Sequence, residues 1–231
     1  MEEAVFEIPR RRSRRHRRRH GRGPRRVIIG VLAACLLGGG FWWLTREQPL
    51  PGQNISLPDY VEQDLLPVNQ WSRPGTPLEN IDGVVIHYVG NPGTTAQANR
   101  NYFASLSSGE EGTYASSHFI VGLEGEVIQC IPLTEIAYAS NERNDDTLSI
   151  EVCHPDETGV FSDVTYWRVV DLTAWLCRTF HLDPMKDVIR HYDVTGKLCP
   201  LYYVEHPEAW EDFLVDVEAA MEALAAQEDA D

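Results

Sequence analysis

An uncharged apolar run divides this chain into two parts and restricts where each part can fold. Residues 27–44 (VIIGVLAACLLGGGFWWL) carry no charge, and eleven Arg lie from Arg10 to Arg26, directly before the run. Eighteen helical residues rise about 27 Å, close to the hydrocarbon thickness of a bilayer. Trp42 and Trp43 stand near the far end of the run, where indole rings favour the headgroup region. The run therefore predicts a single transmembrane anchor in the lipid bilayer.

The Arg residues also predict the orientation. Arg-rich flanks stay in the cytoplasm, so we expect residues 1–26 to form a basic cytoplasmic tail and the body of the chain to be extracytoplasmic. Two alternatives stay open. Leu32-Ala33-Ala34-Cys35 resembles a bacterial lipoprotein signal with Cys35 as the lipidated residue, although the apolar run continues for nine residues beyond it. A cleaved signal peptide needs small residues at its cleavage site, and FWWLTREQ supplies none.

The two parts of the chain carry opposite charge. Residues 1–46 hold twelve Lys and Arg against three Asp and Glu, a net charge of +9. Residues 47–231 hold eight against 32, a net charge of −24, which leaves −15 for the whole chain. An acidic body repels phosphate backbones, which argues against nucleic acid as a partner. The 231 residues suffice for one sizeable domain with appendages, which we expect to be a monomer.

Proline content separates the apolar run from that domain. Six prolines between residues 45 and 80 resist helix and central strand, so this segment is interpreted as a proline-rich linker that merges into an extended entry segment. The linker is expected to lead into a domain over residues 81–226, where the patterns become regular.

Short strands alternate with helices in that domain. Val84–Ile86 is a β-branched run bounded by glycines, SHFIVG and EVIQCI flank a hairpin turn, and TLSIEVCH and DVIRHYD are further strands, the last running into a loop. Thr94 and Thr95 can cap a first helix, Asp163 a second, and Pro207 opens a third. The predicted apolar stripes are Ala98, Tyr102 and Leu106 for the first helix, Val169, Leu172, Leu176 and Phe180 for the second, and Trp210, Leu214, Val217, Met221 and Leu224 for the third. This order predicts an α/β fold, a central mixed β-sheet with helices on both faces.

Three side chains far apart in the sequence are candidate metal ligands. His87 ends the first strand, and His191 and Cys199 lie in RHYDVTGKLCP. Imidazole and thiolate are ligands that Zn²⁺ prefers, and three protein ligands with an open fourth position are typical of a catalytic site. The residues alone also allow a plainer interpretation, in which His87 caps a strand and Cys199 is a buried thiol.

Four segments, in order, resemble the zinc-dependent N-acetylmuramoyl-L-alanine amidase family, which includes phage lysozyme-type amidases and peptidoglycan-recognition proteins. These segments are VVIHYVG, YASSHFIVGLEGEVIQCIPL, DDTLSIEVCHPDETGVFS and VIRHYDVTGKLCP, and the resemblance covers residues 81–203. The resemblance implies Zn²⁺ as the cofactor, bound by His87, His191 and Cys199.

The resemblance also implies the catalytic residues. Glu151 matches the family's glutamate at the end of a central strand and is expected to act as the general base. Lys197, two residues before Cys199, matches a lysine that stabilises the oxyanion. Some members carry a tyrosine directly before the histidine of the SHF segment, where this chain has Ser117. Tyr114 is a poor substitute, because strand alternation and the turn are expected to aim it elsewhere.

Loop residues are weaker candidates for substrate binding. Asn91, Tyr138 and Asn141 are expected to line the groove, where polar and aromatic groups suit a glycopeptide. His154 is expected to touch substrate or to support the site from behind, whereas His118 is expected to be structural.

The remaining cysteines of the domain fit a buried role. Cys130 and Cys153 lie on predicted strands and Cys177 in a predicted helix, where each can pack as a small hydrophobe. An odd number of cysteines argues against a disulfide framework. A Cys130–Cys153 bridge stays open, because the sequence does not give the Cα separation.

Together these features predict a membrane-anchored zinc amidase that degrades the cell wall. Its substrate would be the amide bond between N-acetylmuramic acid and L-alanine in peptidoglycan, which the resemblance implies. The alternative is a non-catalytic peptidoglycan-binding receptor of the same fold: the tyrosine missing at Ser117 favours it, and the retained Cys199 counts against it. No residue excludes a different amide or peptide bond in the same polymer.

Overall fold

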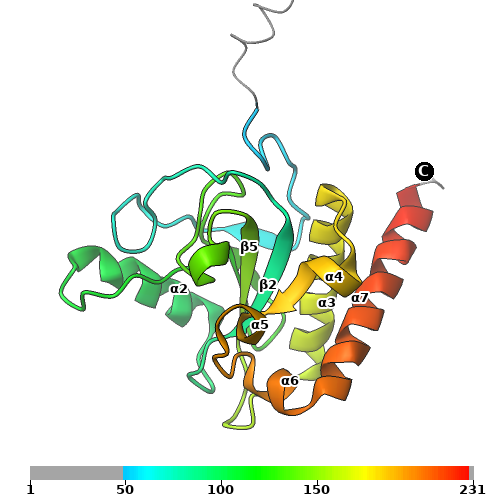
Figure 1. Ribbon diagram of the computed structural model, residues 1–231. Helices are drawn as coiled ribbons and strands as arrows, with labels where there is room; N and C mark the ends of the chain where they lie inside the picture. Colours follow the sequence, from blue (N-terminus) through cyan, green and yellow to red (C-terminus); the bar gives the residue numbers. More distant parts are fainter. Residues whose placement is uncertain (1–48, 229–231) are drawn as a thin grey trace, which may run out of the picture. The chain divides into compact units, whose positions relative to one another are not determined.

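A six-stranded mixed β-sheet forms the centre of residues 49–228, the part of the chain that the computed structural model describes (Figure 1). In order across the sheet, the strands are β1 (Val61–Gln63), β4 (Val127–Gln129), β3 (Phe119–Val121), β5 (Thr147–Val152), β2 (Gly83–Tyr88) and β6 (Val188–Arg190). Neighbouring strands run parallel except β3 and β4, which pair antiparallel as the predicted hairpin. The prediction of a mixed sheet in an α/β fold is confirmed.

Helices α3 (Asp163–Phe180) and α7 (Pro207–Glu228) cover one face of the sheet (Figure 1). Ser162, one residue before the predicted cap, accepts a hydrogen bond from the backbone N–H of Thr165 and so begins α3. The predicted stripes of both helices are confirmed. Their buried members are Val169, Leu172, Leu176, Trp210, Leu214 and Val217, while Phe180, Met221 and Leu224 pack partly buried against the same core.

Helix α2 (Ala96–Ser105) lies on the opposite face, so helices cover both faces as predicted (Figure 1). Thr95 caps it by accepting a hydrogen bond from the N–H of Ala98. Two members of the predicted buried stripe are wrong, because Ala98 is exposed and Tyr102 is 44% exposed, whereas Leu106, directly after the helix, is buried as predicted. Ala96 and Phe103 are buried instead, since the larger apolar side chain of Phe103 faces the second core below the helix.

Short helical segments connect these elements. They are η1 (Leu106–Ser108), η2 (Asn141–Arg143), α4 (Pro184–Asp187), α5 (His191–Thr195) and α6 (Leu201–Glu205). The chain after β6 was expected to be a loop, but it turns directly into α5 at His191. Cys130, Cys153 and Cys177 are buried free thiols, which leaves no Cys130–Cys153 bridge.

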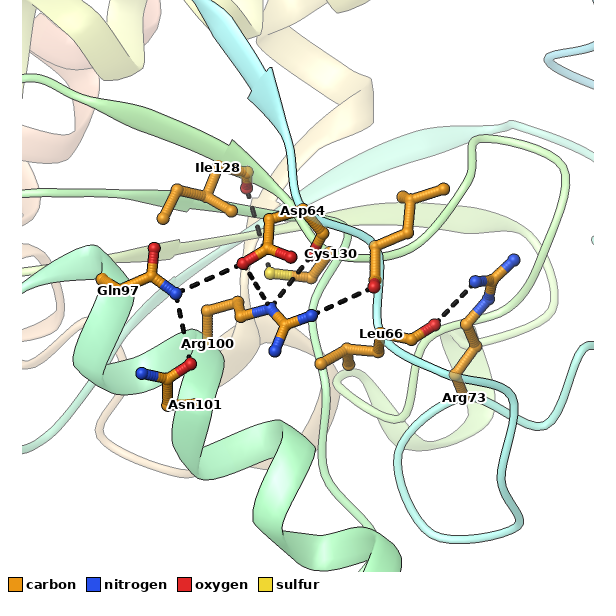
Figure 2. A network of polar contacts seen from close by, with 9 residues as sticks. Asp64, Leu66, Arg73, Gln97, Arg100, Asn101, Ile128 and Cys130 are labelled. Atoms are coloured by element: carbon orange, nitrogen blue, oxygen red, sulfur yellow. Dashed lines mark hydrogen bonds and ion pairs between the residues drawn. The ribbon is translucent and has the colours of Figure 1, made fainter.

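Two arginines tie the segment before residue 81 to the rest of the fold. Arg100 on α2 donates to the backbone carbonyls of Asp64 and Leu65 at 3.1 and 3.0 Å and forms an ion pair with the Asp64 carboxylate at 2.8 Å. Arg73 donates to the carbonyl of Leu66 and pairs with Glu135. Figure 2 shows both guanidinium groups beside this stretch of chain. These contacts satisfy carbonyl groups that belong to no strand.

The packed domain therefore begins earlier than predicted. Strand β1 lies within the predicted linker (residues 45–80) and pairs with β4, and Leu66 is completely buried. The compact unit extends from Pro49, so a boundary at residue 81 falls inside it. The prolines of this stretch argue against a central strand. A three-residue strand at the edge of the sheet is still possible, because it forms only a few hydrogen bonds with its neighbour.

The predicted anchor (residues 27–44), its basic tail (residues 1–26) and Cys35 lie outside the described residues. Within residues 49–228, no helix combines the length and the apolar character that crossing a bilayer requires.

Replacing Arg100 with alanine is expected to destabilise the domain by about 1–3 kcal/mol, because hydrogen bonds to charged groups are lost and two carbonyls lose their donors. Urea unfolding of residues 49–231 measures the effect. Lys186→Ala is the control, because Lys186 is 75% exposed in its pair with Asp183, and such pairs contribute about 0–1 kcal/mol. Equal losses in the two variants would contradict a special role for Arg100.

Candidate metal centre

The register of three parallel strands brings the candidate residues together. His87 on β2 stands opposite Glu151 on β5, and Ile86 stands opposite Arg190, the last residue of β6. His191 follows Arg190 directly, so it comes next to His87 at the same edge of the sheet. Carboxyl ends of parallel strands share one edge, which is where ligand sites of such sheets form.

Alternation along β5 decides which face carries the site. Leu148 and Ile150 belong to the core under α3 and α7. Ser149 and Glu151 therefore point to the opposite face, since successive side chains of a strand alternate. Helix α2 covers that face only in part, and a cavity of about 380 Å³ remains over it.

The three candidate ligands converge at this edge. The Nδ1 atoms of His87 and His191 lie 3.1 Å apart, and the sulfur of Cys199 lies 3.9 Å from Nδ1 of His87. All three residues are buried, and their ligand atoms lie within 4.8 Å of one another. Cys199 reaches this position through the turn at Gly196, whose φ of 76° is left-handed, and its carbonyl accepts from the N–H of Tyr192.

The donor set fits a tetrahedral Zn²⁺ ion. Zinc bonds of about 2.05 Å to nitrogen and 2.3 Å to sulfur place two nitrogens about 3.3 Å apart and a nitrogen and a sulfur about 3.6 Å apart. The distances at this site differ from those values by a few tenths of an ångström. His87, His191 and Cys199 are thus the residues that would hold the ion.

Burial sets the protonation of these groups in the metal-free protein. Burial, His191 and Lys197 lower the pKa of His87 well below its usual value, and burial with Lys197 lowers that of His191. Neutral imidazoles are the form that binds metal. Burial, followed by Glu151, raises the pKa of the Cys199 thiol to about 12. A coordinated cation reverses this preference, because a bound thiol is deprotonated outright.

Glu151 and Lys197 line the cavity beside the ligands, as do His87 and His191. The Oε2 atom of Glu151 is buried and has no hydrogen-bond partner among the residues that the structure describes. Burial raises the pKa of Glu151 to about 8 against a smaller opposing effect of Lys197. Lys197 itself is exposed on the turn before Cys199. The site therefore offers one buried carboxylate and one cation on the walls of a single cavity.

The predicted substrate-binding residues divide into two pairs. Tyr138 and Asn141 line the cavity. Asn91 does not, and lies exposed in the turn after β2, where its carbonyl accepts from Thr94. His154 does not line it either, because it is buried against the ring of Tyr88 and its Nδ1 contacts the carbonyl of Asp156 at 2.7 Å.

Tyr114 lines the cavity, contrary to the prediction that it points elsewhere. Its ring packs 4.7 Å from that of Trp71 and 5.4 Å from that of Tyr138. The alternation argument failed because β3 begins only at Phe119, so Tyr114 belongs to no strand. His118 is buried and contacts Ser149 and the Glu135 carbonyl, in agreement with a structural role.

Several residues in or beside the cavity were not predicted from the sequence. Phe103, Ser116 and Asn144 join the lining, and Ser140 contacts His87 from behind. A serine or asparagine in a loop resembles any other polar surface residue, so only the path of the loop reveals these positions.

Comparison with known proteins adds the following similarities. Residues 77–201, just over half of the chain, match the family described as N-acetylmuramoyl-L-alanine amidase. The N-acetylmuramoyl-L-alanine amidase BlyA of Bacillus subtilis strain 168 is 34% identical over 176 residues, which cover 68% of this chain and 46% of that protein. The N-acetylmuramoyl-L-alanine amidase CwlL of Bacillus licheniformis is 31% identical over 156 residues, which cover 62% of this chain and 42% of that protein. The chain thus spans less than half the length of these relatives.

Solved structures share the fold. A mutant endolysin from Bacillus subtilis superimposes with a TM-score of 0.56 at 22% identity, over 68% of this chain and 97% of the other. The PlyG catalytic domain superimposes with a TM-score of 0.59 at 20% identity, over 70% of this chain and 94% of the other. At these identities the similarity concerns the fold.

Glu151→Gln is expected to stabilise the metal-free protein at pH 8 but hardly at pH 5. The pKa of Glu151 rises from 4.5 to about 8 on folding, so between these values the unfolded chain releases a proton that the folded chain keeps. The free energy of unfolding therefore falls as the pH rises through this range, by at most about 1.4 kcal/mol per pH unit. Glutamine does not titrate, so the free energy of unfolding of the variant does not fall in this way as the pH rises.

Urea unfolding of residues 49–231 after chelation, at pH 5 and pH 8, measures the difference between the variant and the original domain. A gain of a few kcal/mol at pH 8 and of about 1 kcal/mol or less at pH 5 is expected. The same difference at both pH values would show that the carboxylate is not held protonated by burial.

Proposed function

Because the chain belongs to the N-acetylmuramoyl-L-alanine amidase family, we propose that it is a zinc-dependent amidase that hydrolyses the amide between N-acetylmuramic acid and L-alanine in peptidoglycan. The observation that carries the proposal is the convergence of His87, His191 and Cys199, with both histidines on the wall of the cavity. Glu151 and Lys197 line the same cavity, which supplies the groups that hydrolysis of an amide needs.

The metal ion and the general base have separate roles in the attack on the amide. His87, His191 and Cys199 would hold a Zn²⁺ ion, whose chemistry there would be to lower the pKa of water and to polarise the scissile carbonyl. The charge of a bound ion would oppose the effect of burial on the pKa of Glu151 and favour its carboxylate form, which would accept the proton of the attacking water and pass it to the leaving nitrogen of alanine. The Oε2 atom of Glu151 is the one that would hold that proton, because no group within residues 49–228 forms a hydrogen bond with it.

Lys197 stabilises the negative charge that develops on the carbonyl oxygen. Its side chain lines the cavity and lies two residues from Cys199, so its ammonium group is tethered near the ligands. A preorganised cation at a developing oxyanion is worth about 3 kcal/mol, or roughly a hundredfold in rate.

The cavity walls suit a glycopeptide. Tyr114 and Tyr138 present aromatic surface. Asn141 presents an amide group that can donate to or accept from a peptide or an N-acetyl group, and Asn144 presents an NH2 group that can donate. A cavity of about 380 Å³ lies within the range of pockets that take small ligands, so it would hold the scissile bond and its neighbouring groups.

The test is digestion of purified peptidoglycan with the zinc-loaded full chain, followed by mass spectrometry of the fragments. Free stem peptides with an N-terminal alanine are expected. Glu151→Gln is expected to lower the rate about 10²–10⁴-fold, and Lys197→Met about 10²-fold, each with the zinc content unchanged. A chelator is expected to abolish the activity, and added zinc to restore it.

Lys186→Met is the matched control, because Lys186 is exposed on α4 and lines no part of the cavity. Fragments cut at another amide bond would refute the proposed bond. Tight binding of intact peptidoglycan with no fragments would make the protein a receptor instead.

We further propose that residues 27–44 anchor the chain as a single-pass membrane protein, with the domain extracytoplasmic. The support is the length, the absence of charge and the Arg-rich flank of this run. The full chain is expected to stay with membranes after alkaline carbonate extraction, whereas residues 49–231 become soluble. Cys35→Ala separates the two kinds of anchor, since a lipoprotein loses its membrane attachment in that variant and a spanning helix keeps it.

A further inference from the structure

We propose that Ser140, fixed by Asn144, is a positioning residue that holds the His87 ring in its metal-binding tautomer. The inference rests on the proposed metal site and concerns two residues in the loop around η2. Ser140 is 1% exposed, and its Oγ lies 3.2 Å from Nε2 of His87. Nδ1, the other nitrogen of that ring, is the atom that faces His191 and Cys199.

The tautomer follows from this arrangement. Nδ1 can bind a metal only when it carries no proton, so the proton of the neutral ring must sit on Nε2. Nε2–H is buried, and Ser140 Oγ lies within hydrogen-bond distance on that side of the ring and can accept a hydrogen bond from it. Without the hydroxyl, the proton moves more readily to Nδ1, where Nδ1 of His191 lies at 3.1 Å as an acceptor. That alternative tautomer blocks the metal.

Asn144 fixes the position of Ser140. Its Oδ1 accepts from the backbone N–H of Ser140 at 2.7 Å and of Ala139 at 3.1 Å, so one carboxamide oxygen holds two consecutive residues. The N–H of Arg143 donates to the carbonyl of Ser140 at 3.0 Å and closes the turn. Asn144 also lines the cavity, so the same side chain borders the substrate and supports the metal ligand.

The test measures the zinc affinity of the full chain by competition with a chromophoric chelator. Ser140→Ala is expected to weaken zinc binding about 10–100-fold, the usual effect of removing an outer partner of a metal-bound histidine. Ser140→Thr keeps the hydroxyl and is expected to restore most of the affinity. Asn144→Ala is expected to weaken zinc binding, whereas Asn144→Asp keeps the accepting oxygen and is expected to weaken it less.

The domain offers a matched control for a merely structural effect. Ser149 is as buried as Ser140, and its Oγ lies 3.0 Å from Nδ1 of His118, a histidine outside the metal site. Ser149→Ala is expected to lower the free energy of unfolding but to leave the zinc affinity unchanged. In the cobalt-substituted protein, Ser140→Ala is expected to shift the visible absorption bands, and Ser149→Ala is not.

The outcomes separate this inference from the proposed function. If the chain binds zinc, loses it in His87→Ala and keeps its full affinity in Ser140→Ala, the positioning role is refuted and the metal site stands. If His87→Ala binds zinc as tightly as the original chain, the metal site itself is refuted. Equal losses of affinity in Ser140→Ala and Ser149→Ala would show general destabilisation and also refute the positioning role.

Discussion

The pairing of β2 with β5 and β6 is the constraint on which the site depends. Parallel register sets His87 opposite Glu151 and brings His191 to the same edge, although these residues are far apart in sequence. A shift of one residue in either pairing would turn a ligand or the carboxylate toward the apolar core. The hydrophobic residues between them, such as Ile86 and Ile150, hold the register because they must stay buried.

The two faces of the sheet have different roles: one packs the apolar core and the other carries the candidate site. The face under α3 and α7 is filled with apolar side chains, while the face under α2 leaves room for a cavity lined by polar groups. Glu151 illustrates the cost of this arrangement, because its buried oxygen has no hydrogen-bond partner in the described part of the chain. Groups that break a local packing rule in this way are common at functional sites, where the substrate or a metal completes the contacts.

Local patterns predicted much of the fold. The stripes of α3 and α7, the β3–β4 hairpin and the mixed sheet followed from periodicity, because the residues that form each pattern are close neighbours in the chain. The buried face of α2 and strand β1 did not follow. Ala96 and Phe103 are buried because of the core below them. Strand β1 is held by its pairing with β4, and two arginines bind the residues that follow it. Such partners lie too far along the chain to leave a local signal.

The sequence by itself determined the kinds of elements, the family resemblance and the candidate ligands His87, His191 and Cys199. Only the tertiary structure decided which side chains surround them. Tyr114 borders the cavity, Asn91 and His154 do not, and Ser140 supports His87 from behind. The reason is physical: periodicity and motifs depend on neighbours along the chain, whereas a site depends on strand register and on the paths of loops that no short pattern encodes.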